Sequence, residues 1–519
     1  MLIYIRPDLS AHLPDEVDHF DFLTGLQGEV YREVQGRRTL RFECNGRGFF
    51  IKVHTGIGWR EIFRNLILFR RPVLGASSEW KAIRRLEEIG VPTTKLAAYG
   101  QKGWNPAWRR SFVVTDELTG TVSLEQLCLR QHGMQASAEQ LKRKRQLVHE
   151  VAAMTRQLHN KGINHRDCYL CHFLVKEEGE VMTGVQLPQL YLIDLHRAQI
   201  RDRTPIRWRI KDLAGLLYSA MDAGLTRRDL LRFVREYGDQ PLRTSIERDA
   251  RFWRRVEIRA GRDRRRSRCR RWKKYRNRIF QNDQEFVRRN DPGWLSVSLR
   301  DRESPAFTGL LADPDSSLGL PGSRLLKEGD TTTVWRTVVD GRPVVIKRYN
   351  LKGRFHRLRR ALSRSRAATS WINAHRLLFH GMTTAPPLAM VEERMGPVRG
   401  RAWFISDYVA GETALQHMTR YPSGDGAESS ARALAEMFRR LAECRISHGD
   451  MKGSNIILSG EGPVLIDLDA MVGHRTQVRF LRRQQRDLRR FMKNWRNLPY
   501  VENLIRAGMS GAGLPVEDS

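Results

Sequence analysis

Residues 163–167 read Ile-Asn-His-Arg-Asp, and residues 192–195 read Leu-Ile-Asp-Leu. The same order returns in the second half of the chain, where residues 446–455 read Ile-Ser-His-Gly-Asp-Met-Lys-Gly-Ser-Asn and residues 465–468 read Leu-Ile-Asp-Leu. Each half therefore carries a His-x-Asp loop followed by a second aspartate at the end of an apolar strand. This duplication predicts two domains of the same kind in one polypeptide.

Two aspartates in this order are the residues that phosphoryl transfer requires on a protein-kinase-like scaffold. The loop aspartate would accept the proton of the attacking hydroxyl, and the strand aspartate would hold Mg²⁺ against the phosphates of ATP. One such loop alone is as often an ordinary surface turn, but an ordered series that occurs twice favours chemistry. The catalytic candidates are Asp167, Asp450, His165, Arg166 and Lys452, and the strand aspartates are Asp194 and Asp467.

A lysine precedes each His-x-Asp loop at the end of an apolar strand, where it would bind the α- and β-phosphates. Lys52 and Lys347 each lie between a glycine-containing turn and a predicted helix. Glu79, near the start of the helix predicted over Ser77–Ile89, is placed to pair with Lys52, whereas residues 369–373 of the second half contain no acid. The other ATP-binding candidates are the turn glycines Gly36 and Gly329 and the predicted hinge residues Asp116, Leu118, Asp407 and Val409.

The fifth residue after each loop aspartate would bind a second metal ion, and kinases usually have asparagine there. Asn455 fits this pattern, whereas the first half has His172, and Mg²⁺ prefers hard oxygen ligands to imidazole. Asp212 and Asp487 open later helices and are expected to brace the backbone of the catalytic loops. They follow the two strand aspartates by 18 and 20 residues, which leaves little room for the peptide platform of a protein kinase.

The sequence predicts an α+β fold made of two tandem protein-kinase-like bilobal domains, each with a small β-rich N-lobe and a mainly helical C-lobe. A chain of 519 residues is too long for one compact core. In the first half, strands are expected at Glu29–Val34, Thr39–Cys44 and 48–54, and a long helix at Ala138–Lys161. The predicted divisions are a first domain at 1–280, a linker at 281–322 rich in Pro, Gly, Asp and Ser, a second domain at 323–500 and a tail at 501–519.

The chain carries 91 Lys and Arg against 58 Asp and Glu, which gives a formal charge of +33. Such a charge implies an anionic partner: nucleic acid, an anionic membrane surface or a phosphorylated substrate. The excess is concentrated in residues 248–278, where 16 residues are Lys or Arg and 3 are acidic. The N-terminus lacks a signal-peptide pattern and no apolar run approaches bilayer length. We therefore expect the protein in the cytoplasm, on the inner face of a membrane.

Residues 168–172, Cys-Tyr-Leu-Cys-His, match the C-x-x-C-H pattern of c-type haem attachment. Haem attachment requires export, and this pattern lies inside the predicted catalytic loop, so we expect neither haem nor zinc there. The six cysteines are scattered along the chain and suggest no disulfide framework.

Residues 162–174, Gly-Ile-Asn-His-Arg-Asp-Cys-Tyr-Leu-Cys-His-Phe-Leu, together with residues 36–42 and 56–62, resemble the WaaP-type lipopolysaccharide core heptose kinases. The resemblance covers about residues 1–280, and His172 belongs to that family's pattern.

The second half resembles, more loosely, the wider lipopolysaccharide kinase group that includes Kdo kinases. The residues that carry this similarity are His448 to Asn455 and Asp467, within about 320–500.

The resemblance implies a Gram-negative enzyme, peripheral on the cytoplasmic face of the inner membrane, that uses ATP and Mg²⁺. It would transfer the γ-phosphate to a sugar hydroxyl of the lipid A–core oligosaccharide, with an inner-core heptose as the target of the first domain. Residues 248–278 would then hold the enzyme on the anionic membrane surface or on the phosphates and carboxylates of the acceptor.

Other interpretations remain open from the sequence. The second domain is either a second core sugar kinase or a pseudokinase that serves as a binding module, because residues 369–373 lack an acid. A protein Ser/Thr kinase is the alternative enzyme. A nucleic-acid-binding protein would explain the charge but leaves both His-x-Asp loops unexplained, so no specific nucleic-acid partner is expected.

Overall fold

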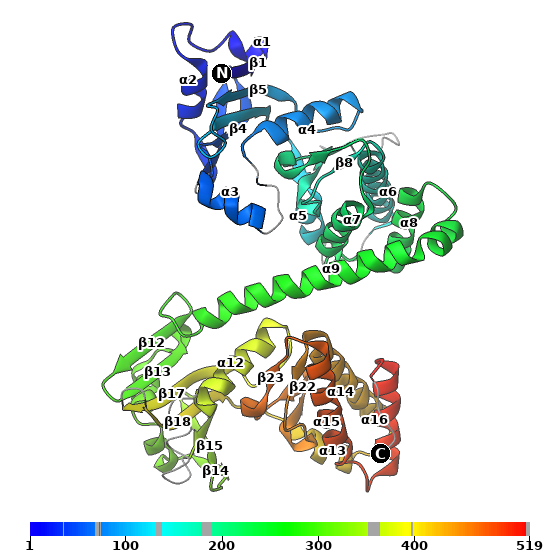
Figure 1. The fold of residues 1–519 in the computed structure, drawn as a ribbon. Helices are drawn as coiled ribbons and strands as arrows, with labels where there is room; N and C mark the ends of the chain where they lie inside the picture. Colours follow the sequence, from blue (N-terminus) through cyan, green and yellow to red (C-terminus); the bar gives the residue numbers. More distant parts are fainter. Residues whose placement is uncertain are drawn as a thin grey trace. The chain divides into compact units, whose positions relative to one another are not determined.

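The structure of the chain is a computed structural model that describes residues 1–514 other than Gln35, 68–71, Val73, 131–136, 178–188, 351–363 and 396–397. Contacts divide the chain into two units, Met1–Ser267 (unit 1) and Arg268–Ser519 (unit 2). Each unit has one sheet-rich part and one helix-rich part (Figure 1). The fold is thus a mixture of helices and sheets, as the sequence predicted.

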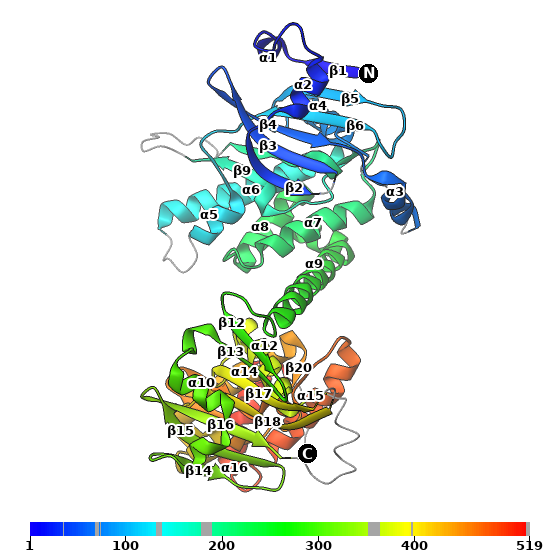
Figure 2. The same cartoon turned by 90° about the vertical axis from the view of Figure 1, so that its left-hand side faces the viewer.

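The large sheet of unit 1 has six antiparallel strands in the order β1-β5-β6-β4-β3-β2 (Figure 2). The turn Asn45-Gly46 joins β3 to β4, and its φ values of 49° and 68° are those of a tight hairpin turn. Phe49, Ile51 and Val53 alternate along β4 into the core, so Lys52 lies on the other face. The strands are β1 Leu2–Ile5, β2 Glu29–Val34, β3 Arg37–Cys44, β4 Arg47–His54, β5 Leu96–Lys102 and β6 Arg110–Asp116.

One helix of this part matters most for the site, because α4 (Ser77–Glu88) packs on the sheet. It buries Ala82, Ile83 and Leu86 and places Glu79 in the interior. The other helices here are α1 Pro7–Ser10, α2 His19–Gly25 and α3 Gly58–Ile67.

The helix-rich part of unit 1 is built around α6 (Ala138–Asn160), which begins with a capping box between Ser137 and Gln140. Two small sheets, β10-β9-β7 and β11-β8, bring the two predicted active-site loops together. Ile193 N donates to His172 O at 3.0 Å across them. The elements are β7 Thr121–Ser123, α5 Leu124–Arg130, β8 Ile163–Asn164, η1 Leu170–His172, β9 Phe173–Lys176, β10 Leu190–Leu192, η2 Leu195–Arg197, β11 Gln199–Ile200, α7 Ile206–Ala220 and α8 Arg227–Gly238.

The basic segment forms most of a long helix, α9 (Leu242–Arg278), with one non-helical residue at Asp249. Val256 and Ala260 are buried in a cluster of unit 1. Trp272 and Tyr275 pack instead against the core of unit 2. The contact boundary at residue 267 therefore lies inside this helix rather than at the predicted position of 280. Among the described residues, no helix, α9 included, is both long enough and apolar enough to cross a membrane.

Unit 2 repeats the plan with a seven-stranded antiparallel sheet in the order β12-β13-β17-β18-β16-β15-β14. Its helix α12 (Arg366–Phe379) packs on this sheet as α4 does in unit 1. The strands are β12 Phe286–Asp291, β13 Trp294–Leu299, β14 Arg324–Lys327, β15 Thr332–Val339, β16 Arg342–Tyr349, β17 Pro387–Met395 and β18 Val398–Asp407. The short helices are η3 Arg300–Arg302, α10 Pro305–Ala312 and η4 Asp315–Gly319.

The helix-rich part of unit 2 centres on α14 (Asp425–Cys444). Two small sheets, β19-β21-β22 and β20-β23, hold its loops. The remaining elements are β19 Glu412–Thr413, α13 Ala414–Arg420, β20 Ile446–Ser447, η5 Gly453–Asn455, β21 Ile456–Ser459, β22 Gly462–Leu465, η6 Leu468–Ala470, β23 Val472–Gly473, α15 Gln477–Met492 and α16 Pro499–Gly511.

The prediction of a linker at 281–322 was wrong. The hairpin β12–β13 extends the sheet of unit 2, and Phe286, Leu295 and Val297 are buried in its core. The Pro, Gly and Ser residues that suggested a linker are turn and cap residues: Pro292-Gly293 forms the hairpin turn, and Ser304 caps α10.

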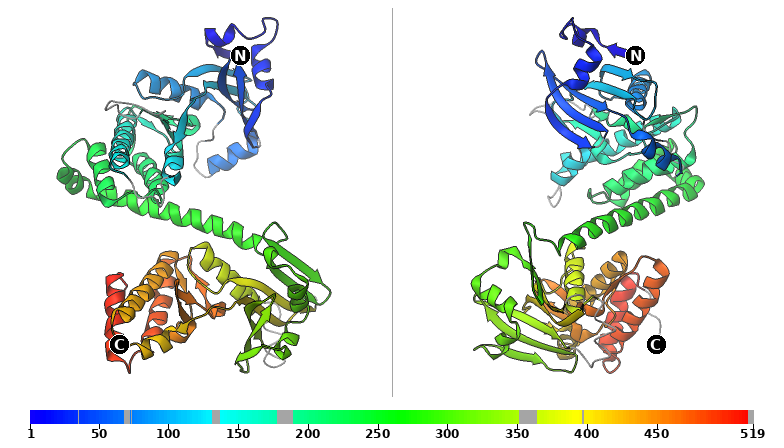
Figure 3. Two further views of the ribbon diagram at one scale, coloured as in Figure 1. Left: turned by 180° about the vertical axis from the view of Figure 1, so that it is seen from behind. Right: turned by 60° about the vertical axis from the view of Figure 1, so that its left-hand side comes forward.

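The tail predicted at 501–519 is not separate from the second domain, because it begins inside helix α16. Helix α16 packs beside α14, visible as neighbouring elements in Figures 1 and 3. Val501, Ile505 and Met509 recur every fourth residue and are fully buried. Residues 515–519 lie outside the described residues.

Candidate active sites

In unit 1, Lys52 is the centre of a buried ion-pair network. Strand β4 carries this lysine, whose Nζ donates to Glu79 Oε1 of α4 at 2.5 Å and to Asp194 Oδ1 at 3.1 Å. Burial opposes the charge of Lys52, but the two carboxylates outweigh it and raise the lysine pKa. The predicted lysine, helix acid and strand aspartate therefore meet at one point.

Asp194 sits in a left-handed backbone conformation, with φ 60° and ψ 54°, at the start of η2. His196 Nδ1 lies 2.7 Å from Asp194 Oδ1, and Arg37 Nη2 lies 3.8 Å from the same oxygen. Burial alone would raise the aspartate pKa, but the hydrogen bond from His196 and the charge of Lys52 hold it well below its usual range. Asp194 is thus an anion surrounded by donors, which suits a metal ligand.

Asp167, the predicted base, is held by a residue that the sequence analysis did not identify. Arg197 Nη1 donates to both carboxylate oxygens of Asp167, at 3.0 and 2.9 Å. Arg197 is the last residue of η2, three positions after Asp194, so one short turn supplies both a metal-type ligand and a partner for the base. This pair is accessible, because Asp167 keeps 17% of its side-chain surface exposed and Arg197 keeps 38%.

Asp212 holds the backbone of the catalytic loop. Its two carboxylate oxygens accept the N–H groups of His165 at 2.7 Å and Arg166 at 2.8 Å. These bonds support Arg166 in the left-handed region, at φ 71°. His165 is buried, lies 3.0 Å from Ile193 O through Nε2, and has its pKa lowered by burial. His165 and Asp212 therefore shape the loop rather than face solvent.

His172 occupies the position of the usual asparagine in a geometry that fits a metal ligand. Its Nδ1 donates to the carbonyl oxygen of Asp167 at 2.7 Å, and its Nε2 lies 3.5 Å from Asp194 Oδ2. In a neutral ring with this hydrogen bond, Nε2 carries the lone pair, and it and the carboxylate could hold a cation between them. Asn455 makes the matching contact in unit 2, where its Nδ2 donates to Asp450 O at 2.8 Å and leaves the amide oxygen available.

The lysine site of unit 2 is built differently from that of unit 1. Lys347 forms an ion pair with Asp467, which has φ 61°. Its Nζ also lies 5.0 Å from the ring centre of Tyr349. Burial opposes the charge of Lys347, but Tyr349 and Asp467 outweigh it and raise the lysine pKa. Lys347 thus has one carboxylate and one aromatic ring beside it, whereas Lys52 has two carboxylates.

Helix α12 is tied to this site through other groups. Ser370, one of the residues in the stretch without an acid, is buried and lies 2.7 Å from the hydroxyl of Tyr349. Arg366 pairs with Asp469 and lies over the same ring at 4.8 Å. Unit 2 therefore lacks the helix acid, but these other contacts link α12, the ring of Tyr349 and Lys347.

Asp450 has two cationic neighbours. Lys452 Nζ lies 3.2 Å from Asp450 Oδ2, and Arg490 of α15 forms an ion pair with Oδ1. Asp487 accepts the N–H groups of His448 at 2.7 Å and of Gly449 at 2.9 Å, as Asp212 does in unit 1. Burial raises the pKa of Asp487.

The predicted hinge residues lie at the ends of β6 and β18, where each chain leaves its large sheet. The carboxylates of Asp116 and Asp407 bind Arg6 at 2.8 Å and Arg302 at 3.2 Å. Those carboxylates are therefore occupied within the sheet-rich parts. Leu118 and Val409 are half-buried just beyond them.

The two turn glycines differ. Gly36 has φ 81°, and a side chain there would meet the carbonyl oxygen of Gly56. Gly329 accepts the N–H of Thr332 at 3.2 Å and has no such restriction. The same sequence pattern predicted both glycines, but the backbone requires glycine only at position 36 and not at position 329.

The two cysteines of the C-x-x-C-H pattern lie in surroundings that disfavour the thiolate form. Cys168 is buried, which raises the pKa of its thiol well above the usual value, and burial raises that of Cys171 to about 11. Their thiols are therefore protonated at neutral pH.

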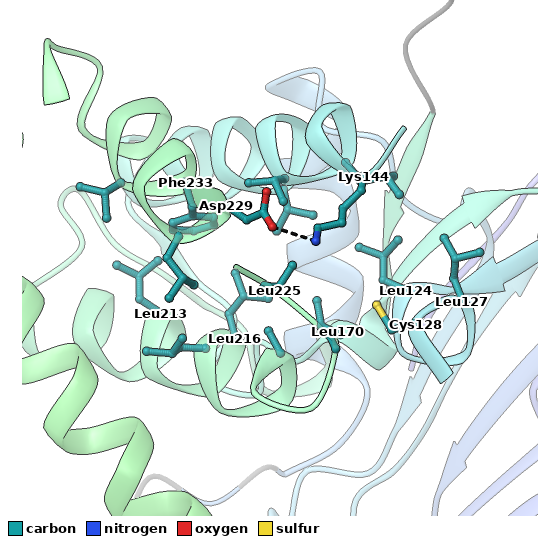
Figure 4. A pocket seen from close by; sticks show the side chains of 18 of the residues that line it. Leu124, Leu127, Cys128, Lys144, Leu170, Leu213, Leu216, Leu225, Asp229 and Phe233 are labelled. Atoms are coloured by element: carbon teal, nitrogen blue, oxygen red, sulfur yellow. Dashed lines mark ion pairs between the residues drawn. The ribbon is translucent and has the colours of Figure 1, made fainter. Parts of the chain in front are cut away.

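A separate cavity of about 190 Å³ lies among α5, α6, α7, α8 and α9 of unit 1 (Figure 4). Its walls are mostly apolar, with leucines such as Leu124, Leu213 and Leu216, and it carries one ion pair, Lys144–Asp229 at 2.8 Å. The lining contains neither Lys52 nor Asp167 nor Asp194, so it is distinct from the network above.

Comparisons with known proteins place both halves of the chain in one group. The family model "Lipopolysaccharide kinase (Kdo/WaaP) family" matches residues 21–237 and 321–508. A "Lipopolysaccharide core heptose(I) kinase WaaP" from Pseudomonas aeruginosa is 52% identical over 233 residues, which cover 45% of this chain and 85% of the relative. The protein of the same name from Escherichia coli K12 is 48% identical over 231 residues, covering 44% and 83%.

A solved structure titled "WaaP in complex with acyl carrier protein" is 43% identical to this chain, with a TM-score of 0.43. The match covers 50% of this chain and 99% of that one.

Proposed function

Because the chain belongs to the lipopolysaccharide kinase (Kdo/WaaP) family, we propose that unit 1 phosphorylates a sugar hydroxyl of the lipopolysaccharide core, an inner-core heptose hydroxyl in particular. The observation that carries this proposal is the network of Lys52, Glu79 and Asp194 beside Asp167. It provides a phosphate-binding cation, a metal-type ligand and a base in one site. The heptose assignment rests on residues 162–174 and on relatives that are 48–52% identical.

We further propose that each unit is a bilobal kinase-like domain, with ATP between its sheet-rich and helix-rich parts. In unit 1, Lys52 would bind the α- and β-phosphates while Glu79 fixes its position. Gly36 would allow the backbone to approach the phosphates, and the backbone around Asp116 and Leu118 would contact the base. Gly329, Lys347, Asp407 and Val409 would serve unit 2 in the same way.

A divalent cation fits the residues beside Lys52. Asp194 and His172 present facing acceptor atoms in unit 1, and Asp467 with the free amide oxygen of Asn455 offers an all-oxygen pair in unit 2. Mg²⁺ bound there would neutralise charge on the β- and γ-phosphates.

The chain's own groups then perform the transfer. Asp167, oriented by Arg197, accepts the proton of the acceptor hydroxyl as the new bond forms between that oxygen and the γ-phosphorus. The bond between the γ-phosphorus and the β–γ bridging oxygen breaks, and ADP leaves with that electron pair. Asp212 keeps the catalytic loop in place through two backbone N–H groups.

We propose that unit 2 is a second core sugar kinase rather than a binding module. Lys347 is paired with Asp467, and Asp450 is placed between Lys452 and Arg490. Tyr349 and Arg366 replace the missing helix acid in organising α12. The acceptors of the two units would differ, because the cations beside Asp167 and Asp450 come from different elements.

Mass spectrometry of core oligosaccharide from cells that express the full chain, Asp167→Ala or Asp450→Ala tests these proposals. Loss of one phosphate in each variant, at different sugars, is the expected result. Loss with Asp167→Ala alone would leave unit 2 as a binding module. If neither variant lost phosphate while the purified chain phosphorylated peptides efficiently, the protein Ser/Thr kinase interpretation would replace this one.

A further inference from the structure

Trp208, on the first turn of α7, is surrounded by cations. Arg166, Arg207 and Lys211 each lie 5.6 Å from the centre of its ring system, and Arg201 lies at 5.7 Å. These four residues come from the catalytic loop, from the chain after β11 and from α7 itself. One indole ring can favour a nearby cation, but four cations around it repel one another.

The carboxylates close to this cluster are already occupied. Asp167 is held through both oxygens by Arg197, and Asp212 is held by the N–H groups of His165 and Arg166. The Nε of Arg166 is buried and has no hydrogen-bond partner. Arg166, Arg201 and Lys211 are half-buried and Arg207 is exposed, and the unused Nε–H of Arg166 is a donor that an anion could accept from.

Burial lowers the pKa of Lys211 to about 8; the charges of Asp167 and Asp212 oppose this shift, and the charges of Arg166 and Arg197 add to it. Burial and the charge of Arg197 also lower the pKa of Arg166. An anion bound here would reverse these effects.

We infer that the cations around Trp208 form an acceptor-side site for an oxyanion, a carboxylate or phosphate of the sugar acceptor, beside the hydroxyl that Asp167 deprotonates. The cluster adjoins Asp167 through Arg166, the preceding residue. The inference rests on the proposed function and names the substrate chemistry that unit 1 selects. An anion bound there would fix the acceptor, so that Arg207 and Lys211 determine affinity and Asp167 determines turnover.

Unit 2 keeps only part of this cluster. Counting from the paired aspartates, Arg207 corresponds to Arg482 and Lys211 to Arg486, whereas Arg166 corresponds to Gly449 and Trp208 to Arg483. The indole ring and the loop arginine are therefore the parts of the site that unit 2 does not share.

The test measures the acceptor KM and kcat of the full chain with lipid A–core oligosaccharide. The variants are Arg207→Gln and Lys211→Gln, with Lys211→Arg to restore the charge. Arg209→Gln is the matched control, because it removes one charge from the same helix, where Arg209 donates to Asn160 at 2.9 Å and not to the cluster. Three acceptors are compared: the intact oligosaccharide, one with its carboxylates reduced to alcohols, and one with its phosphates removed.

We expect each Gln variant to raise the KM for the intact acceptor about tenfold with kcat changed by less than about twofold. Lys211→Arg and Arg209→Gln should resemble the wild type. One of the two neutralised acceptors should raise the wild-type KM by the same factor, and the Gln variants should show no further loss with it. That acceptor identifies whether the anion is a carboxylate or a phosphate.

Two results would overturn the inference: KM values unchanged in both Gln variants, or a loss of kcat alone, which would make the cations a support for Asp167. The outcome is separable from the proposed function by calorimetric binding of the acceptor to Asp167→Asn. If the Gln variants weaken acceptor binding but the wild type shows no turnover, the kinase proposal fails and the anion site stands. If the wild type turns over and the Gln variants bind the acceptor equally well, the anion site fails and the kinase proposal stands.

Discussion

The two loop aspartates receive their cations from different places in the chain. Asp167 is held by Arg197, from the short helix after the strand aspartate, whereas Asp450 is held by Lys452 of its own loop and Arg490 of α15. A cation beside the proposed base fixes the direction of the carboxylate, but it must leave an oxygen free to accept the proton. Both loop aspartates thus have cationic partners, but the two units supply them from different parts of the chain.

Replacing Arg197 by methionine should lower the kcat of unit 1 about tenfold to a hundredfold, because Asp167 loses its orientation. The KM for ATP should stay near the wild-type value, since Lys52, Glu79 and Asp194 are untouched. Steady-state kinetics with saturating acceptor measures both, and Arg197→Lys is the control that keeps the charge. An unchanged kcat in Arg197→Met would contradict a positioning role.

The acceptor KM of unit 1 should rise with pH above about 8, the pKa of Lys211. Above that pH the lysine loses its proton and therefore its attraction for an anion; below it the charge is complete. The charged groups that act on this lysine are Asp167, Asp212, Arg166 and Arg197. Measuring KM between pH 7 and 9.5 in the wild type and in Lys211→Arg, which stays charged, should give a rising and a flat profile. Two parallel profiles would show that another group is responsible.

In unit 2, Tyr349→Leu should weaken ATP binding about fivefold, because Lys347 loses the aromatic face beside it. Tyr349→Phe retains the ring and loses the bond to Ser370, so it should bind ATP as the wild type does. Calorimetry on the full chain carrying Lys52→Met isolates the unit 2 site. Equal loss in the two variants would instead assign the effect to the hydroxyl.

At this scale the sequence predicts residues whose order along the chain is characteristic, and it misses those supplied by the fold. Lys52, Glu79 and Asp194 were identified because lysine, helix acid and strand aspartate occur in a fixed succession. Arg197 and Arg490 could not be identified, because only the three-dimensional course of η2 and α15 directs them to an aspartate. The sequence of one unit alone would have given no signal for either arginine.

Elements were predicted well where apolar periodicity is strong. The helices expected over Ser77–Ile89 and Ala138–Lys161 are α4 and α6, which end at Glu88 and Asn160. Two segments differ from the prediction because their composition is typical of loops while their apolar periodicity is that of a strand or a helix. In 281–322 the turn residues of a hairpin and a cap conceal alternating apolar positions, and in 501–514 glycines conceal a repeat of four.

The burial of α16 leads to a stability prediction. Ile505→Ala should lower the free energy of unfolding of unit 2 by about 2–4 kcal/mol, because the side chain is fully buried against α14. Asn503→Ala, an exposed position on the same helix, should change it by less than about 0.5 kcal/mol. The variants are compared by urea unfolding of the full chain, monitored by the change in fluorescence at the transition of the less stable unit. Equal stability of the two would mean that α16 does not support the core.

At the scale of the whole molecule, the charge of +33 and the helix α9 belong together. Exposed cations recur on α9 at Arg262, Arg266, Arg270 and Lys273, a spacing of four, four and three residues that keeps them on one side of the helix. We propose that this side binds an anionic membrane surface.

Changing these four residues to glutamine should reduce co-sedimentation with vesicles that contain about 30% anionic lipid, by tenfold or more at low salt. Binding of the wild type should fall as salt increases. The control removes four exposed cations elsewhere, Lys142, Arg227, Arg228 and Arg235. Equal losses in the two quadruple variants would make the attraction a matter of net charge rather than of α9.

The division of α9 between two cores limits how the polypeptide can be separated into working pieces. Val256 and Ala260 complete a cluster of unit 1, and Trp272 and Tyr275 complete the core of unit 2. If unit 2 were produced from residue 281 onward, the domain border predicted from the sequence, it would lack the packing of Trp272 and Tyr275. Either unit, produced alone, would therefore have to include its own end of α9.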